Sequence, residues 1–169
     1  MAQAVVEFIL RVLSGVPDFL KIIVLAMAPL TEYQLAIPVA IERFHFAPFT
    51  AYLLALIGSL CLFFPLYFGL DALRGFVSKT LPVLLRPLDA FLLRAEHKMK
   101  DNYAKYGAFA LFLFLVIPFP LTGIWTATTA AVVLKIPFRP AFLGILCGVL
   151  GGQLLVTILT VGVGALIGQ

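Results

Sequence analysis

The stretch Ile117-Pro-Phe-Pro-Leu-Thr-Gly-Ile-Trp125 lies in the middle of residues 106–134, a run that contains no Asp, Glu, Lys or Arg. As one continuous helix this run would be about 43 Å long, which exceeds a hydrocarbon core of about 30 Å. Pro118, Pro120 and Gly123 interrupt the run close to its midpoint. Because proline removes a helical hydrogen bond, we expect two short arms that each reach about half way through a bilayer.

The tripeptide Pro120-Leu-Thr122 has a copy at Pro29-Leu-Thr31, which again separates two apolar arms, at residues 19–28 and 31–41. A Phe-x-Pro motif follows each copy, at Phe46-Ala-Pro48 and at Phe138-Arg-Pro140. Such internal similarity indicates a duplicated unit. The sequence therefore predicts two repeats, each made of a broken helical hairpin and a transmembrane helix.

Composition indicates the class of protein. Hydrophobic residues make up 63% of the chain and charged residues 12%, and the mean hydropathy is +1.12. These values are those of an all-α integral membrane protein, and the length suits a single membrane domain. In chain order we expect an interfacial helix (1–16), repeat 1 (17–70), a connector (71–105) and repeat 2 (106–169).

The N-terminal segment carries apolar residues at helical spacing, which predicts a helix lying in the membrane interface. A simple start of the next helix is an equally good interpretation. The residues on the expected apolar face are Val5, Phe8, Ile9, Val12 and Leu13.

The net charge of +4 reflects membrane topology rather than affinity for nucleic acid. Most of the twelve basic residues lie in residues 71–105, and the positive-inside rule places this amphipathic connector in the cytoplasm. Lys105 and Lys135 give the second hairpin basic ends as well. The first hairpin has balanced flanks, and residues 48–70 cross the membrane once between the two. We therefore expect inverted repeats with re-entrant hairpins, an architecture used by secondary transporters.

Each expected spanning helix carries a small residue at every fourth position, which lets helices approach closely in lipid. Docking of each hairpin against its own span is the preferred interpretation, and homodimerisation is the alternative. The residues are Ala51, Ala55 and Ser59 in repeat 1, and Gly144, Gly148 and Gly152 in repeat 2.

The helix breaks should expose backbone groups that water does not reach. Thr31 and Gln34 have the spacing of a capping box, and Thr122 opens the second arm with Trp125 in the reciprocal position. Free amides at the two arm starts would attract an anionic headgroup or carboxylate.

Glu32 directly follows the first break and would lie deep in the membrane, where a carboxylate must be protonated, paired or hydrated. One interpretation is a carboxylate that couples transport to protons or binds a cation. The other is a carboxylate that only satisfies hairpin amides. Three further polar residues, Gln153, Thr157 and Thr160, either line a polar path or bond within their own helix.

Three stretches resemble the small multidrug export protein family: Ala28-Pro-Leu-Thr-Glu-Tyr-Gln-Leu-Ala-Ile-Pro38, Ile57-Gly-Ser59 and Ile117 to Thr126. The chain is also similar to the DedA (SNARE-associated) membrane superfamily. The resemblance implies a multi-pass protein of the prokaryotic plasma membrane with two re-entrant hairpins and a transport role. It assigns Glu32 and Pro38 to the first hairpin, and to the second hairpin Pro118, Pro120, Thr122, Gly123 and Trp125. We expect the hairpin breaks at four prolines: Pro29, Pro38, Pro118 and Pro120.

The chain also departs from the family pattern, which usually has arginine at Gln34, glycine at Leu35 and asparagine at Ser59. DedA proteins carry arginines in the second hairpin, and this chain has none between Lys105 and Lys135.

Taken together, these patterns predict a transporter or flippase of an amphiphilic, anionic, lipid-like substrate, coupled to protons at Glu32. The alternatives are a small multidrug exporter, an energy-independent lipid scramblase and a structural assembly factor. The expected substrate and proton site comprises Glu32, Thr31, Gln34, Thr122, Gly123, Trp125 and Thr126. Neither break combines a nucleophilic side chain with a general base that could activate it, so an enzyme is not expected. Cys61, Cys147, His45 and His97 form no ligand cluster, so no metal or cofactor is expected.

Overall fold

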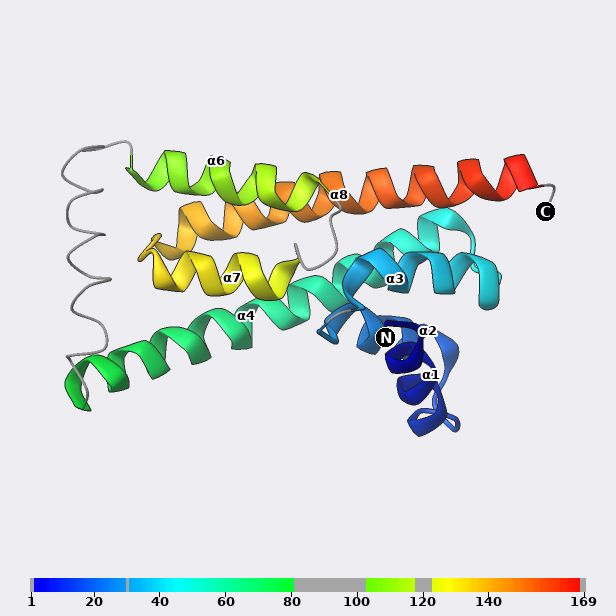
Figure 1. The fold of residues 1–169 in the computed structure, drawn as a ribbon, viewed down its shortest axis with the longest axis horizontal. Helices are drawn as coiled ribbons and strands as arrows, with labels where there is room; N and C mark the ends of the chain where they lie inside the picture. Colours follow the sequence, from blue (N-terminus) through cyan, green and yellow to red (C-terminus); the bar gives the residue numbers. More distant parts are fainter. Residues whose placement is uncertain (1, 30, 81–102, 118–122, 168–169) are drawn as a thin grey trace.

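The structure is a computed structural model that describes residues 2–29, 31–80, 103–117 and 123–167, and every regular element among them is helical (Figure 1). The elements are α1 (Ala2–Val12), α2 (Asp18–Met27), α3 (Glu32–Pro38), the π-helix η1 (Val39–Arg43), α4 (Pro48–Thr80), α6 (Tyr103–Val116), α7 (Ile124–Val133) and α8 (Phe138–Ile167).

Two long helices, α4 and α8, run along most of the molecule (Figure 1). Each contains a segment long and apolar enough to cross a bilayer, Pro48–Leu70 in α4 and Phe138–Leu166 in α8, with a mean hydropathy of 2.2 in both. These segments correspond to the two expected spans. Helix α4 continues to Thr80, so it extends into the part of the chain assigned to the connector. The amphipathic helix expected after Pro82 lies outside the described residues.

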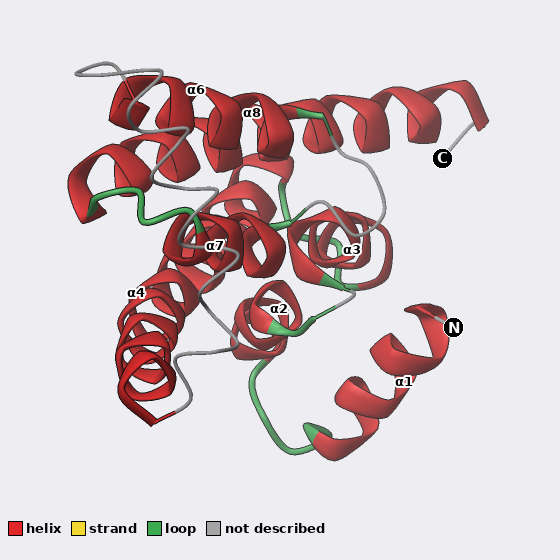
Figure 2. Ribbon diagram, turned by 60° about the vertical axis from the view of Figure 1, so that its left-hand side comes forward, coloured by secondary structure: helices red, strands yellow, loops and turns green. Residues whose placement is uncertain are grey.

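Of the shorter helices, α3 and α7 each contact both long ones. Figure 2 shows α2, α3 and α7 nearly end-on, with α4 on one side and α6 and α8 on the other. The first helix pair, α2 with α3, ends in η1 and leads into α4, and the second pair, α6 with α7, leads into α8. The break predicted at Pro29 is present, because α2 ends at Met27 and α3 begins at Glu32.

Pro38 does not have its expected place at a break. It lies inside the helix, and the chain continues directly into η1 as a π-helix up to Arg43. The prediction of a break at Pro38 is therefore wrong. Proline at this position coincides instead with a change from α to π hydrogen bonding, which keeps the segment helical.

The glycine stripe of α8 faces α6. A Cβ atom added at Gly144 or Gly152 would overlap backbone atoms of α6, and one at Gly148 would lie 2.7 Å from Leu115 Cβ. The two helices therefore approach more closely than larger residues would permit, which is the docking arrangement rather than a surface left for a second copy.

The corresponding stripe of α4 is also buried. Ala51 and Ala55 are fully enclosed in a core cluster with residues of α2 and α3. The tightest approach to α2 occurs at Gly58, where an added Cβ would lie 2.5 Å from the Ile23 carbonyl oxygen. Ser59, one residue further on, faces α8 and accepts a hydrogen bond from Gln153 Nε2 at 3.2 Å.

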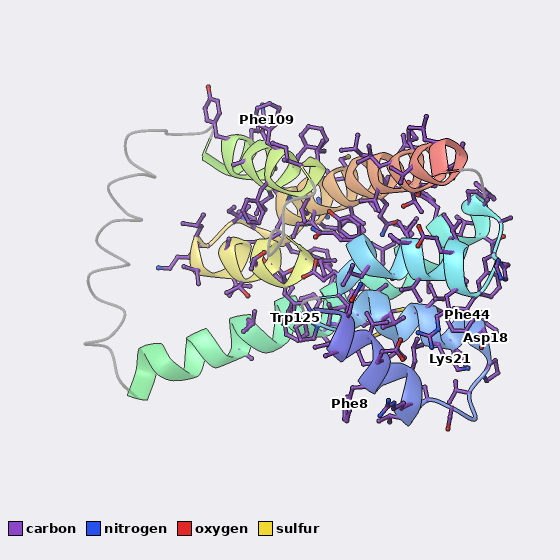
Figure 3. All side chains as sticks on the ribbon, turned by 45° about the vertical axis from the view of Figure 1, so that its right-hand side comes forward. Phe8, Asp18, Lys21, Phe44, Phe109 and Trp125 are labelled. Carbon is purple, nitrogen blue, oxygen red and sulfur yellow. The ribbon has the colours of Figure 1, made fainter. Side chains whose placement is uncertain are left out.

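Helix α1 is separate from α2, since it ends at Val12 and α2 begins at Asp18. The alternative that it simply starts the next helix is therefore wrong. Phe8 and Val12 are 68% and 66% exposed, whereas Val6 and Leu10 are buried in the core cluster of the first helix pair. Figure 3 shows Phe8 pointing away from the body of the molecule. Helix α1 thus packs one apolar side against the rest of the protein and exposes a second apolar side at the surface.

Candidate functional site

The two helix breaks meet inside the molecule. The carboxylate of Glu32, at the start of α3, accepts a hydrogen bond of 2.8 Å from the backbone N–H of Ile124, the first residue of α7. The two residues are 92 positions apart in the chain. Glu32 is only 8% exposed, so this contact is largely shielded from the surroundings.

Two further side chains join the breaks. The Tyr33 hydroxyl donates to the Leu115 carbonyl at 2.9 Å, near the end of α6. The indole N–H of Trp125 donates to the Met27 carbonyl at 2.9 Å, at the end of α2. Figure 3 places Trp125 in the interior, where α7 approaches the first helix pair.

All three contacts use backbone groups that a helix end leaves without an intrahelical partner. Ile124 supplies an N–H from the first turn of α7, while Met27 and Leu115 supply carbonyls from the last turns of α2 and α6. In hydrocarbon such groups have no water to bond. Each helix pair therefore satisfies the broken backbone of the other.

The capping predicted for Thr31 is not what the structure shows. Its hydroxyl donates to the carbonyls of Leu25 (2.7 Å) and Ala28 (3.2 Å), and it makes no side-chain capping bond to α3. The Thr31–Gln34 capping box is therefore wrong. The reason lies in the backbone: Thr31 has a φ of −99° and a ψ of −54°, which are not the extended angles of a capping residue.

The second arm is also capped differently from the prediction. The N-cap residue is Gly123 rather than Thr122, and the side chain that bonds back to the N-cap is that of Thr126. The Thr126 hydroxyl accepts from the Gly123 N–H at 3.1 Å and donates to the Gly123 carbonyl at 2.9 Å. Thr122, Pro118 and Pro120 lie outside the described residues.

These contacts correct the expectation of free amides at the second break. The Gly123 N–H is bonded to Thr126 and the Ile124 N–H to Glu32. The anionic position at the start of α7 is thus occupied by a carboxylate of the chain itself. A Cβ atom at Gly123 would overlap the Glu32 carboxylate, so any larger residue there would require the carboxylate to move.

A cavity of about 110 Å³ lies at the meeting point. Within the described residues, every residue of the expected substrate and proton site lines it, together with Pro29. The lining residues are Pro29, Thr31, Glu32, Gln34, Gly123, Trp125 and Thr126. Glu32 is the only ionisable side chain among them, so the cavity presents one carboxylate beside an indole ring.

The polar residues of α8 do not reach this cavity. Thr157 and Thr160 donate to the carbonyls of Gln153 and Val156 in their own helix, both at 2.8 Å. The alternative of bonding within the helix is therefore correct for both threonines. Gln153 ties α8 to α4 through Ser59.

Tyr33 is the residue that the sequence interpretation missed. It is fully buried and bonds across the site, although only its neighbours were singled out. A signal was present, because a phenol beside a helix break in an apolar segment needs an acceptor, and the broken helices supply one.

These features define the class of protein. Two long apolar helices pack on two broken helix pairs that contact each other through hydrogen bonds at helix ends, as in helical membrane proteins. The family described as "Putative small multi-drug export protein" matches residues 32–155, and the chain belongs to this family. Comparison with curated proteins and with solved structures gave no match.

Proposed function

We propose that this chain is a plasma-membrane transporter in which the two helix pairs are re-entrant hairpins of inverted repeats. The contact between Glu32 and Ile124 supports this, because two hairpins that enter from opposite faces would meet by their tips at mid-depth. In Figure 1, α2 and α3 lie toward one end of α4 and α8, and α6 and α7 lie toward the other. The family description, which names export, supports the transport role.

The cavity size indicates that this conformation is closed. Its volume of about 110 Å³ is well below the roughly 300–1,000 Å³ of sites that enclose a small molecule. An amphiphilic substrate would therefore enter only when the hairpin tips separate. Separation must break the bonds that Glu32 and Trp125 make across the site.

The carboxylate of Glu32 can control that separation. While ionised, it accepts a charge-assisted hydrogen bond from Ile124. A proton on Glu32 removes the charge and weakens this bond, which frees the amide at the start of α7 for an anionic group of the substrate. One proton and one anionic group would then occupy the site together, so substrate movement would be coupled to the proton gradient.

The single observation that carries this proposal is the Glu32–Ile124 bond, and Glu32→Gln tests it. In proteoliposomes that contain a fluorescent anionic phospholipid, we expect the variant to lose gradient-driven movement while it keeps its fold. Asp18→Asn is the matched control, because Asp18 is an exposed carboxylate outside the site, paired with Lys21. Full gradient-driven movement by Glu32→Gln would refute the coupling role.

Lipid movement at the same rate with and without a proton gradient, and at the same rate in Glu32→Gln, would instead identify a scramblase. Absence of any lipid movement in the unmodified chain would favour an assembly role.

The topology has its own test. Cysteines that replace Asp18 and Arg43 should react with an impermeant thiol reagent from one face of the membrane, and those that replace Lys105 and Lys135 from the other. The assay needs a chain without native cysteines. If the two ends of either hairpin were labelled from opposite faces, that segment would cross the membrane and the re-entrant arrangement would be wrong.

The family description favours a second candidate, export of a cationic amphiphile. A cation would pair directly with the Glu32 carboxylate and stack on Trp125, in competition with a proton. Substrate and proton would then move in opposite directions. Measuring the direction of the proton flux that accompanies transport distinguishes the two candidates.

A further inference from the structure

A second and larger hollow lies between α1 and the helical segment that follows the site. It has a volume of about 520 Å³, which is within the range of small-molecule sites. Its wall comes from α1, the second half of α3 and η1. The lining residues are Gln3, Ala4, Val6, Glu7, Leu35, Pro38, Val39, Glu42 and Arg43. We refer to this hollow as the outer cleft.

The lining of the outer cleft combines apolar and charged side chains. Val6, Leu35 and Val39 supply apolar surface from α1, α3 and η1, whereas Glu7, Glu42 and Arg43 supply charge. A ligand that matched both kinds of surface would be an amphiphile, with an apolar body and a charged head.

The sign of the charge follows from the ion pairs. The Arg43 guanidinium donates hydrogen bonds to both carboxylate oxygens of Glu7, so these two charges offset each other. Glu42, the neighbour of Arg43 in the π-helix, has no ion pair with any residue that the structure describes. Arg11 lies one turn from Glu7 on α1 but does not line the cleft. The unpaired charge that faces the cleft is therefore negative.

The backbone of the wall is unusual as well. Residues Val39–Arg43 form a π-helix, and such segments occur frequently at functional sites. Helix α3 separates the cleft from the central cavity, since Gln34 lines the cavity and Leu35 lines the cleft.

We propose that the outer cleft binds an amphiphile that carries an ammonium group, with the ammonium against Glu42 and the apolar body against Leu35 and Val39. The ammonium group could belong to a free lipophilic amine or to a lipid headgroup. This site is distinct from Glu32, and its occupancy does not depend on the proposed coupling mechanism.

Calorimetric titration of the purified full chain in maltoside micelles tests the proposal. One arm uses dodecyltrimethylammonium, a second uses a short-chain phosphatidylethanolamine, and dodecyl phosphate is the anionic control. We expect at least one of the two amines to bind, and dodecyl phosphate to bind more weakly than that amine. The amine with the lower Kd identifies the source of the ammonium group.

Two variants address different parts of the cleft. Glu42→Gln removes the unpaired charge and should raise the Kd of the amine up to about fivefold, the range of a partly exposed ion pair. Val39→Trp fills the apolar part without a change in charge and should also raise the Kd. Asp18→Asn is the control and should leave the Kd unchanged, and thermal unfolding midpoints confirm that each variant is folded.

Three results would overturn the proposal: an unchanged Kd in both cleft variants, equal or tighter binding of dodecyl phosphate, or no binding of either amine. None of these would bear on Glu32, because the transport assay reports on that residue separately.

Discussion

The substitution Gly123→Ala probes the meeting point of the two helix breaks with a single methyl group. The backbone of Gly123 is extended, with φ of −133° and ψ of −168°, so alanine meets no conformational barrier there. The added Cβ would instead overlap the Glu32 carboxylate. The carboxylate must then move, and it loses its hydrogen bond from Ile124.

The magnitude follows from that bond. A hydrogen bond to a charged group contributes about 1.5–3 kcal/mol, and replacing glycine by alanine at a helix N-cap costs about 1 kcal/mol by itself, because alanine is the poorer capping residue. We therefore expect Gly123→Ala to lower the free energy of unfolding by about 2–4 kcal/mol. In a Glu32→Ala background the same change should cost only about 1 kcal/mol, because the group that it displaces is absent.

Reversible unfolding in mixed micelles of increasing dodecyl sulfate content measures these free energies. Trp125 is the only tryptophan of the chain and lines the site, so its fluorescence reports directly on the packing between the two helix pairs. An equal cost of Gly123→Ala in both backgrounds would contradict the reasoning. So would a cost below about 0.5 kcal/mol in the chain that retains Glu32.

Three further predictions follow from other contacts. Gly148→Leu should separate α8 from α6 and lower the unfolding midpoint by several degrees, whereas Gly162→Leu, at a glycine with open space around it, should leave the midpoint unchanged. Tyr33→Phe should cost about 1–3 kcal/mol in the same unfolding assay, because its carbonyl acceptor on α6 is left without that partner; a cost near zero would show that another donor replaces the phenol. The hydrogen bond from Arg43 lowers the pKa of Glu7, so the stabilisation by this pair is fully present above the ordinary carboxyl pKa and is lost as the pH falls through the lowered value. A cysteine on the buried side of α1 should therefore react faster with a thiol reagent below that pH, and a rate independent of pH would show that the pair does not hold α1.

The positions of the first break and of the two long helices could be predicted because their causes are local. Pro29 interrupts hydrogen bonding wherever it lies, and residues 48–70 are long and apolar enough to span without reference to any partner. The small residues of α8 likewise indicated a close helix contact, since packing in lipid depends on side-chain size.

Capping could not be predicted to the residue. The expected caps at Thr31 and Thr122 assumed a regular first turn, but the backbone of Thr31 is not extended and its hydroxyl bonds back to α2. The N-cap of α7 lies one residue after Thr122, at Gly123. The second difference depends on where the first helix pair lies, because its Glu32 side chain occupies the first amide of α7.

The sequence by itself determined that this is an apolar helical chain with two interrupted segments, and it indicated Glu32 as the one carboxylate beside a break. Only the tertiary structure decided what that carboxylate contacts. Glu32 and Ile124 are 92 positions apart, and they meet because α7 packs chiefly on α4, the helix on which α2 and α3 also pack, while α6 packs on α8. Hydrogen bonding by broken helix ends is a local requirement, but the partner that satisfies it is chosen by the packing of the whole bundle.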